Sequence, residues 1–256
     1  MTDTKVKPAA PNLRSLTAAR VSLPMSGHSI ATSEVLEFQL AHAQARDAVH
    51  AALDAERFAR RLRDELPTLT KQGGEVLTLR SCAADRVNYL RHPQRGRCLD
   101  EESAAALKST SCDLAISVAD GLSALAVERN AIPLLALLLP RLAEENWSVG
   151  PITVVQQGRV GVSDAIGERL GASCSLMLIG ERPGLSAADS MGAYLTWEPR
   201  ADRTDADRNC LSNIRDGGLN VETAAERLMW LMKTARAMKL TGVGLKEGTV
   251  NSLLDG

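Results

Sequence analysis

Three apolar runs rich in Val, Ile and Leu dominate the middle of the chain, at residues 113–120, 152–157 and 174–180. Continuous runs of this kind are typical of strands buried on both faces of a parallel sheet. Apolar helical patterns follow the first two runs directly, and strands that alternate with helices indicate right-handed crossovers. The pattern therefore predicts an α/β fold.

Each run ends at a glycine and a polar turn, at residues 120–121, 158–160 and 180–184. In a parallel sheet these three turns fall on one edge, the edge formed by the carboxyl ends of the strands. Ligands of open α/β folds bind at this edge, because the strand ends splay there and helix N-termini offer free N–H groups. We predict a parallel, Rossmann- or flavodoxin-like sheet with helices on both faces, and a ligand-binding crevice at these turns.

The flanking segments are mostly helical. A helix opening at Thr32 with a Ser/Thr cap is followed by a second over residues 54–66, and residues 75–80 are the first strand candidate. Pro133 predicts a break or kink near Asn130 in the long apolar stretch that follows the first central strand. We expect residues 1–12 to be a flexible tail, 13–70 a helical N-terminal arm or subdomain, and 71–256 the α/β domain.

Composition excludes several classes of protein. The 256 residues carry 30 basic and 31 acidic side chains and 3% aromatics, which provide neither a basic field nor stacking platforms for nucleic acid. The five cysteines contain no C-x-x-C, which argues against a structural zinc site or a disulfide framework and fits a reducing cytosol. No apolar run resembles a signal peptide or a membrane span.

The predicted crevice lacks an imidazole, because all four histidines precede the central strands. Ordinary Ser-His catalysis and His-metal catalysis are therefore not expected within it. It contains many other polar residues: Arg159, Asp164, Glu168, Glu181, Arg182, Asp189, Arg200, Asp205, Arg208, Cys210, Asn213 and Arg215. Such a set suits a large polar ligand or a subunit contact better than self-contained acid–base chemistry.

Six motifs occur in order over most of the chain. They are Asp113-Leu-Ala-Ile-Ser-Val-Ala-Asp-Gly-Leu-Ser-Ala124, Gln157-Gly-Arg-Val160, Ile179-Gly-Glu-Arg-Pro-Gly-Leu-Ser186, Asp189-Ser-Met-Gly-Ala-Tyr-Leu-Thr196, Arg208-Asn-Cys-Leu-Ser-Asn-Ile-Arg215 and Leu240-Thr-Gly-Val-Gly-Leu-Lys246. Together with residues 37–50 they resemble the light chain (small subunit) of ethanolamine ammonia-lyase. The resemblance covers nearly everything after about residue 12, and residues 1–11 carry no family signal.

The resemblance implies a function and a partner. Enzymes of this family use adenosylcobalamin to convert ethanolamine to acetaldehyde and ammonia by a radical mechanism. The heavy chain (large subunit), a TIM-type barrel, holds the substrate and the catalytic residues, and the light chain closes over the cobalamin in a hetero-oligomer. Residues 71–256 would then be a cobalamin-binding domain. The family also implies a cytoplasmic location within a bacterial microcompartment, with the N-terminal arm as a targeting segment.

Three positions match the cofactor contacts of the family: Val160, Glu181 and Cys210. Val160 would meet the corrin edge, Glu181 would accept N–H bonds from corrin amides, and Cys210 would pack as a small soft group. Each also has a purely structural interpretation. Val160 could be a core residue, Glu181 could pair with Arg159 or Arg182, and Cys210 could be an inert buried thiol. Arg159 and Arg182 are further candidates.

Two other functions stay open at this point. A stand-alone hydrolase or transferase would be active as the purified chain, and the missing crevice histidine counts against it. A purely structural subunit would bury the heavy chain's surface without touching a cofactor.

Overall fold

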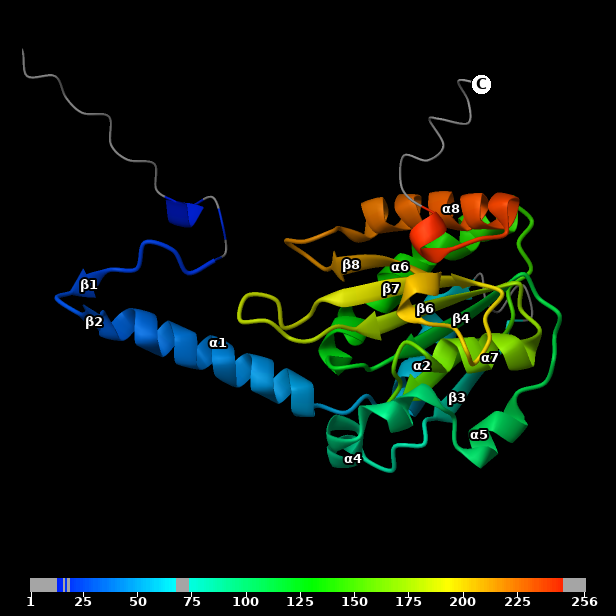
Figure 1. Cartoon of the computed structure of the whole chain (residues 1–256), viewed down its shortest axis with the longest axis horizontal. Coiled ribbons are helices and arrows are strands. Elements are labelled where there is room, and N and C mark those ends of the chain that lie inside the picture. The colour runs from blue at the N-terminus through cyan, green and yellow to red at the C-terminus, as the bar shows by residue number, and fades with distance from the viewer. Residues whose placement is uncertain (1–12, 16, 18, 68–73, 246–256) are drawn as a thin grey trace, which may run out of the picture.

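A six-stranded sheet forms the centre of the computed structural model, which describes residues 13–15, 17, 19–67 and 74–245 (Figure 1). Across the sheet the strand order is β3-β5-β4-β6-β7-β8. The strands are β3 (Val76–Arg80), β4 (Leu114–Ala119), β5 (Ile152–Gln156), β6 (Cys174–Gly180), β7 (Met191–Trp197) and β8 (Arg208–Ile214). The first four pair in parallel, whereas β7 pairs antiparallel with both β6 and β8.

The α/β prediction is confirmed, and the three central strands lie within a residue or two of their expected limits. Two features differ from the expectation. The antiparallel strands β7 and β8 were not predicted. Strand β8 is difficult to recognise in the sequence, because many of its residues are polar and partly exposed. The strand order also differs from those of Rossmann and flavodoxin-like sheets, so that detail of the prediction is not confirmed.

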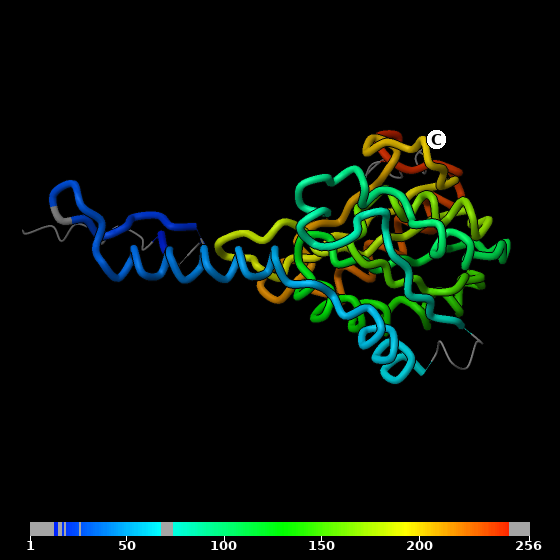
Figure 2. Tube along the Cα trace, turned by 90° about the horizontal axis from the view of Figure 1, so that it is seen from below, coloured from blue at the N-terminus to red at the C-terminus, as the bar shows by residue number. Residues whose placement is uncertain are grey.

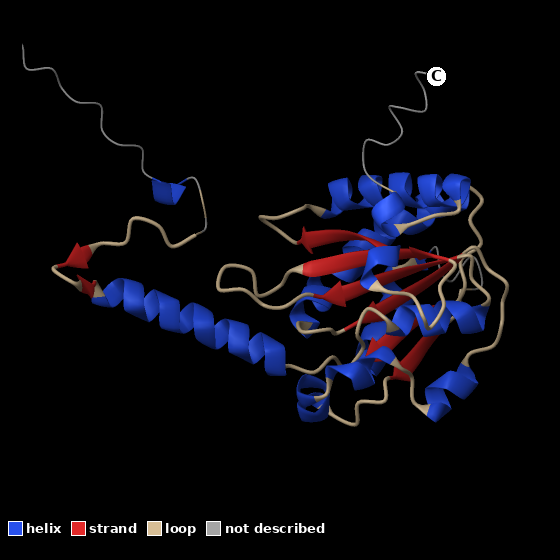
Figure 3. Ribbon diagram, viewed as in Figure 1, coloured by secondary structure: helices blue, strands red, loops and turns tan. Residues whose placement is uncertain are grey.

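Helices cover both faces of the sheet, as predicted (Figure 3). One face packs against α2 (Ala55–Glu65), α6 (Ala124–Glu144) and α8 (Val221–Met238), and the other against α5 (Glu101–Ala106) and α7 (Val162–Leu170). Side chains alternate along a strand, so on β4 Leu114, Ile116 and Val118 join the first core while Ala115 and Ala119 join the second. Each fully buried aliphatic side chain contributes about 1.5–3 kcal/mol to folding.

The predicted break or kink near Asn130 is not a break, because α6 continues through Pro133 and Pro140 as one helix. A proline inside a helix removes one backbone hydrogen bond and costs about 3 kcal/mol. Here the surrounding leucines, including Leu134, Leu135 and Leu138, are fully buried against the sheet and α8. Their burial outweighs the local cost of the proline.

The N-terminal region contains the helix α1 (Thr32–His50), which projects away from the sheet in two perpendicular views (Figures 1 and 2). Its N-cap is Ala31 without a side-chain hydrogen bond, so the predicted Ser/Thr cap is wrong. A short hairpin of β1 (Met25–Ser26) and β2 (Ser29–Ile30) precedes it, after a 3-10 turn at Leu13–Ser15. The preceding segment is tied to α1 by Arg14, whose guanidinium lies 2.7 Å from the carboxylate of Glu34.

The second predicted helix is confirmed as α2, which is capped by the Asp54 side chain and packs Phe58, Ala59 and Leu62 into the core. The predicted flexible tail at residues 1–12 lies outside the described residues, and the domain limits 13–70 and 71–256 stay a prediction. Among the residues that the structure describes, no helix is both long and apolar enough to cross a membrane.

The short elements complete the chain. They are α4 (Arg86–Arg91), followed by 3-10 turns at Pro93–Arg97, Asp205–Asp207 and Gly242–Gly244. The last of these contains the stretch Gly242-Val-Gly244, and it follows α8, not a strand. The Gly-Val-Gly stretch therefore turns the chain and does not open a nucleotide-binding helix.

The glycine turns after β4 and β6 touch each other. The Leu122 N–H donates to the Gly180 carbonyl over 2.9 Å, and Gly121 adopts a left-handed φ of 53°. A Cβ atom at Gly180 would overlap the carbonyl oxygens of Ser123 and Asp120. Glycine is therefore required at position 180 by the close approach of two backbones.

We expect Gly180→Ala to lower the free energy of unfolding by about 2 kcal/mol or more, since the overlapping atoms are backbone and cannot rotate away. Urea denaturation of the purified chain measures the change. Gly184→Ala is the matched control, because its Cβ would meet nothing closer than 4.0 Å. Equal stability of the two variants would show that the turns can separate freely.

Candidate functional site

The three predicted glycine turns meet at the carboxyl edge of the sheet and line one cleft of about 410 Å³. The turns after β4, β5 and β6 supply its walls, and one side chain of β7 completes it. The lining residues are Gly121, Leu122, Arg159, Val160, Ile179, Gly180, Glu181, Arg182 and Tyr194. The prediction that these turns form one crevice is therefore confirmed.

A buried ion pair lies beside this cleft. The Arg86 guanidinium of α4 is 3.3 Å from the Asp120 carboxylate, and both side chains are almost fully buried. The same guanidinium donates to the Gly121 carbonyl over 2.8 Å and to the Val49 carbonyl over 2.8 Å. The Gly158 N–H donates to Asp120 over 3.3 Å. The pair thus joins the end of α1, α4 and the turns after β4 and β5.

Burial raises the pKa of Asp120 to about 6, and the charge of Arg86 with backbone N–H donors opposes this rise only in part. The carboxylate is therefore mostly ionised at neutral pH and needs its partner. Removing one member of such a pair leaves an uncompensated buried charge, which costs about 3–5 kcal/mol. Arg86 and Asp120 are structural supports of the cleft.

Glu181 reaches the cleft from the end of β6 and is held on one side only. Its Oε2 accepts from the Ser190 hydroxyl over 2.5 Å and from the Asn213 backbone N–H over 3.1 Å. Within the described part of the chain Glu181 forms no ion pair, so it is not the partner of Arg159 or Arg182. Its Oε1 accepts no hydrogen bond from a described residue. A Cβ atom at Gly192 would come within 2.9 Å of this oxygen, so glycine at position 192 leaves room for it.

Val160 lies in the turn between β5 and α7. It is half-buried, it packs against the core beneath α7, and it lines the cleft. Its carbonyl accepts from the Ser163 hydroxyl over 2.9 Å, which fixes the turn at the start of α7. The core interpretation is therefore supported by the packing of Val160, and its position in the cleft lining leaves the cofactor contact as a prediction.

Cys210 does not line the cleft, so the structure brings together only two of the three predicted contacts. It lies on β8 opposite Tyr194 of β7, and it is exposed. Partial burial of its thiol is the main cause that raises the pKa of Cys210, and the nearby charge of Glu181 adds to it. Tyr194 therefore stands between Cys210 and the cleft, and an unreactive thiol is expected.

Sequence reasoning missed two tyrosines of this region. Tyr194 forms part of the cleft wall, and burial raises its pKa above the ordinary range. Tyr89 of α4 is fully buried and donates its hydroxyl to the Gly158 carbonyl over 3.0 Å. Tyr194 could have been considered from the sequence, because it lies within one of the six family motifs, at residues 189–196.

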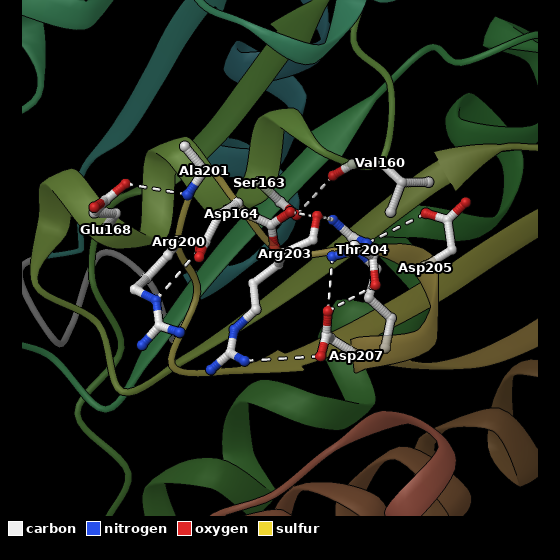
Figure 4. A network of polar contacts seen from close by, with 12 residues as sticks. Val160, Ser163, Asp164, Glu168, Arg200, Ala201, Arg203, Thr204, Asp205 and Asp207 are labelled. Atoms are coloured by element: carbon white, nitrogen blue, oxygen red, sulfur yellow. Dashed lines mark hydrogen bonds and ion pairs between the residues drawn. The ribbon is translucent and has the colours of Figure 1, made fainter.

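Several polar residues predicted for the crevice instead form a separate network beside α7 (Figure 4). Buried Arg208 bonds to buried Asp164 and reaches Asp205 over 3.2 Å. Glu168 accepts from the Ala201 N–H over 3.2 Å. Burial raises the pKa of Asp164 and outweighs the opposing charge of Arg208. This network anchors residues 198–207 to α7 and contributes no cleft lining.

The arrangement offers contacts and no acid–base machinery. Its lining provides one carboxylate, two guanidinium groups, one tyrosine, apolar side chains and the backbone of the glycine turns. Among the described residues, no group of three or more His, Cys, Asp or Glu side chains is placed to hold a metal ion. The cleft is therefore suited to holding part of a large polar ligand.

Comparison with known proteins identifies the family. The family model for the ethanolamine ammonia-lyase light chain matches residues 7–246. The chain is 50% identical over 250 residues to the ethanolamine ammonia-lyase small subunit of Azotobacter vinelandii, covering 95% of this chain and 90% of that protein. The small subunit of Pseudomonas putida strain KT2440 is 50% identical over 248 residues, covering 94% and 89%. That of Pseudomonas aeruginosa strain PAO1 is 49% identical over 250 residues, covering 95% and 89%. The chain belongs to the ethanolamine ammonia-lyase light-chain family.

Proposed function

We propose that this chain works as the small subunit of an adenosylcobalamin-dependent ethanolamine ammonia-lyase and covers one edge of the cobalamin against a large subunit. The observation that carries the proposal is the cleft at the three glycine turns, which contains both Val160 and Glu181. In this proposal residues 71–256 are the cobalamin-binding domain and residues 13–70 the N-terminal arm.

The residues present fit such a cofactor. Drug-sized ligands occupy pockets of about 300–1,000 Å³, and a corrinoid is larger than these ligands. A cleft of about 410 Å³ therefore holds only part of a corrinoid, and a second protein surface must cover the rest. The free Oε1 of Glu181 is an acceptor for the amide N–H groups at the corrin edge. Val160 offers an apolar contact beside it.

The cofactor supplies radical chemistry when it is bound, and this chain positions it. Ser190 and the Asn213 N–H hold one oxygen of Glu181, so the other oxygen has a fixed direction. The Arg86–Asp120 pair fixes the turns that carry Gly121 and Gly158. No described residue of the cleft moves a proton in this account, and ethanolamine with its catalytic residues belongs to the large subunit.

The rival functions have weaker support. A stand-alone hydrolase or transferase requires a nucleophile with a base, and the cleft lining contains neither histidine nor cysteine. A purely structural subunit needs no cleft in which one carboxylate oxygen is left without a donor. Cofactor binding accounts for both observations.

We expect Glu181→Gln to weaken cobalamin binding roughly tenfold to hundredfold, the range for a lost charge-assisted hydrogen bond. The oxygen of glutamine can still accept from Ser190 and Asn213. Its NH2 group then takes the place of Oε1, and two donors would face each other where the glutamate accepts from a corrin amide. Val160→Trp should weaken binding as well, because the larger ring fills the cleft. Spectroscopic titration of the assembled enzyme with adenosylcobalamin measures both effects.

The matched controls are Glu226→Gln on α8 and Val87→Trp on α4, both exposed and outside the cleft lining. All four variants should still assemble with the large subunit, as checked by size-exclusion chromatography. Normal cobalamin affinity in both cleft variants would favour the purely structural subunit.

We also propose a cytoplasmic location within a bacterial microcompartment, with the N-terminal arm as the targeting segment. Exposed apolar side chains on the described part of the arm, such as Leu13 and Met25, support this role. A truncated chain without residues 1–23 should remain assembled but lose co-fractionation with shells. The full-length chain is the control, and normal entry of the truncated chain would refute the targeting role.

A further inference from the structure

Arg159 is held in a fixed position at the edge of the cleft. Its guanidinium lies 4.5 Å from the centroid of the Tyr89 ring, and its backbone N–H donates to the Gly96 carbonyl over 2.7 Å. Arg86 lies over the same ring at 5.0 Å, so Tyr89 contacts two cations. A Cβ atom on Gly96 would meet both Arg159 and Tyr89 at 2.8 Å, which shows how closely this side chain is packed.

Arg159 nevertheless has no acceptor in the described part of the chain. Its Nε is buried without a hydrogen-bond partner, and no described carboxylate pairs with its guanidinium. The two buried arginines differ from Arg159 in having a carboxylate partner, because Arg86 pairs with Asp120 and Arg208 pairs with Asp164, although each also keeps one buried nitrogen without a described partner. A partly buried guanidinium without an acceptor among the described residues is unfavourable, so an acceptor supplied by a ligand would stabilise Arg159.

The surroundings favour an anionic group. Arg182 lines the same cleft, is exposed and also has no ion-pair partner among the described residues. Glu181 is the one acidic residue of the lining, and one of its oxygens already accepts two hydrogen bonds. The lining therefore carries an excess of one positive charge. Guanidinium groups match the geometry of phosphate oxygens, which they bind with two parallel hydrogen bonds.

We propose that Arg159, assisted by Arg182, binds the phosphodiester in the nucleotide tail of cobalamin. This inference rests on the proposed function. The phosphodiester is the ionised acid of the cofactor, whereas the corrin edge carries neutral amides that suit Glu181. The cationic and the acidic side chains of the lining thus suit two chemically different parts of one ligand, and Tyr89 holds the Arg159 guanidinium in place.

The test compares two ligands on the assembled enzyme. Adenosylcobalamin contains the phosphodiester, and adenosylcobinamide lacks the whole nucleotide tail. We expect Arg159→Gln to weaken cobalamin binding roughly tenfold to hundredfold, as for a lost hydrogen bond to a charged group, but to change cobinamide binding by less than about twofold. Arg159→Lys should bind cobalamin more tightly than Arg159→Gln but less tightly than the wild type, because lysine keeps the positive charge and lacks the planar guanidinium that forms two parallel hydrogen bonds.

Arg91→Gln is the matched control, an exposed arginine on the helix that carries Tyr89. Thermal unfolding and size-exclusion chromatography of each variant check folding and assembly. Equal losses for both ligands, or a lysine variant no better than glutamine, would overturn the phosphodiester assignment. Loss of assembly with normal cobalamin affinity would assign Arg159 to a carboxylate of the large subunit instead. Failure of the wild-type enzyme to bind either corrinoid would refute the proposed function itself.

Discussion

The buried ion pair of Arg86 and Asp120 is the interaction on which the cleft depends. One guanidinium contacts the end of α1, the turn after β4 and the carboxylate that receives the N–H of Gly158. These segments are far apart in the sequence, and backbone contacts between two glycine turns bring the end of β6 to the same place. A buried charge is costly unless it is paired and hydrogen-bonded, so the fold is stable only when these turns take their observed positions.

In the proposed function, the work of the enzyme is divided between two chains. The cleft lining has acceptors, cations and apolar surface, but no paired acid and base and no nucleophile next to a base. Such a lining can bind and orient a large cofactor while another protein surface provides the chemistry for the substrate. The size of the cleft supports the same division, because a cleft of about 410 Å³ would cover only one part of a corrinoid. Family membership and local geometry therefore both support the proposed binding role of this chain.

The sequence predicted the parts of this structure that depend on local pattern. Buried Val/Ile/Leu runs located β4, β5 and β6, and the glycine turns located the cleft at their ends. It could not predict that Cys210 would lie behind Tyr194, because this depends on the pairing of β7 with β8. The helix through Pro133 depends likewise on burial against the sheet, and the partners of Arg86 and Arg208 depend on contacts between distant segments.

The most direct measurement is to co-express this chain with an ethanolamine ammonia-lyase large subunit, purify by a tag on this chain, and record the visible spectrum with adenosylcobalamin and ethanolamine. The account predicts that the large subunit co-purifies and that the spectrum shifts to cob(II)alamin only when substrate is present. If the chain purifies without a partner and without bound corrinoid, the account is contradicted, and the chain would instead be interpreted as a binding module for another ligand.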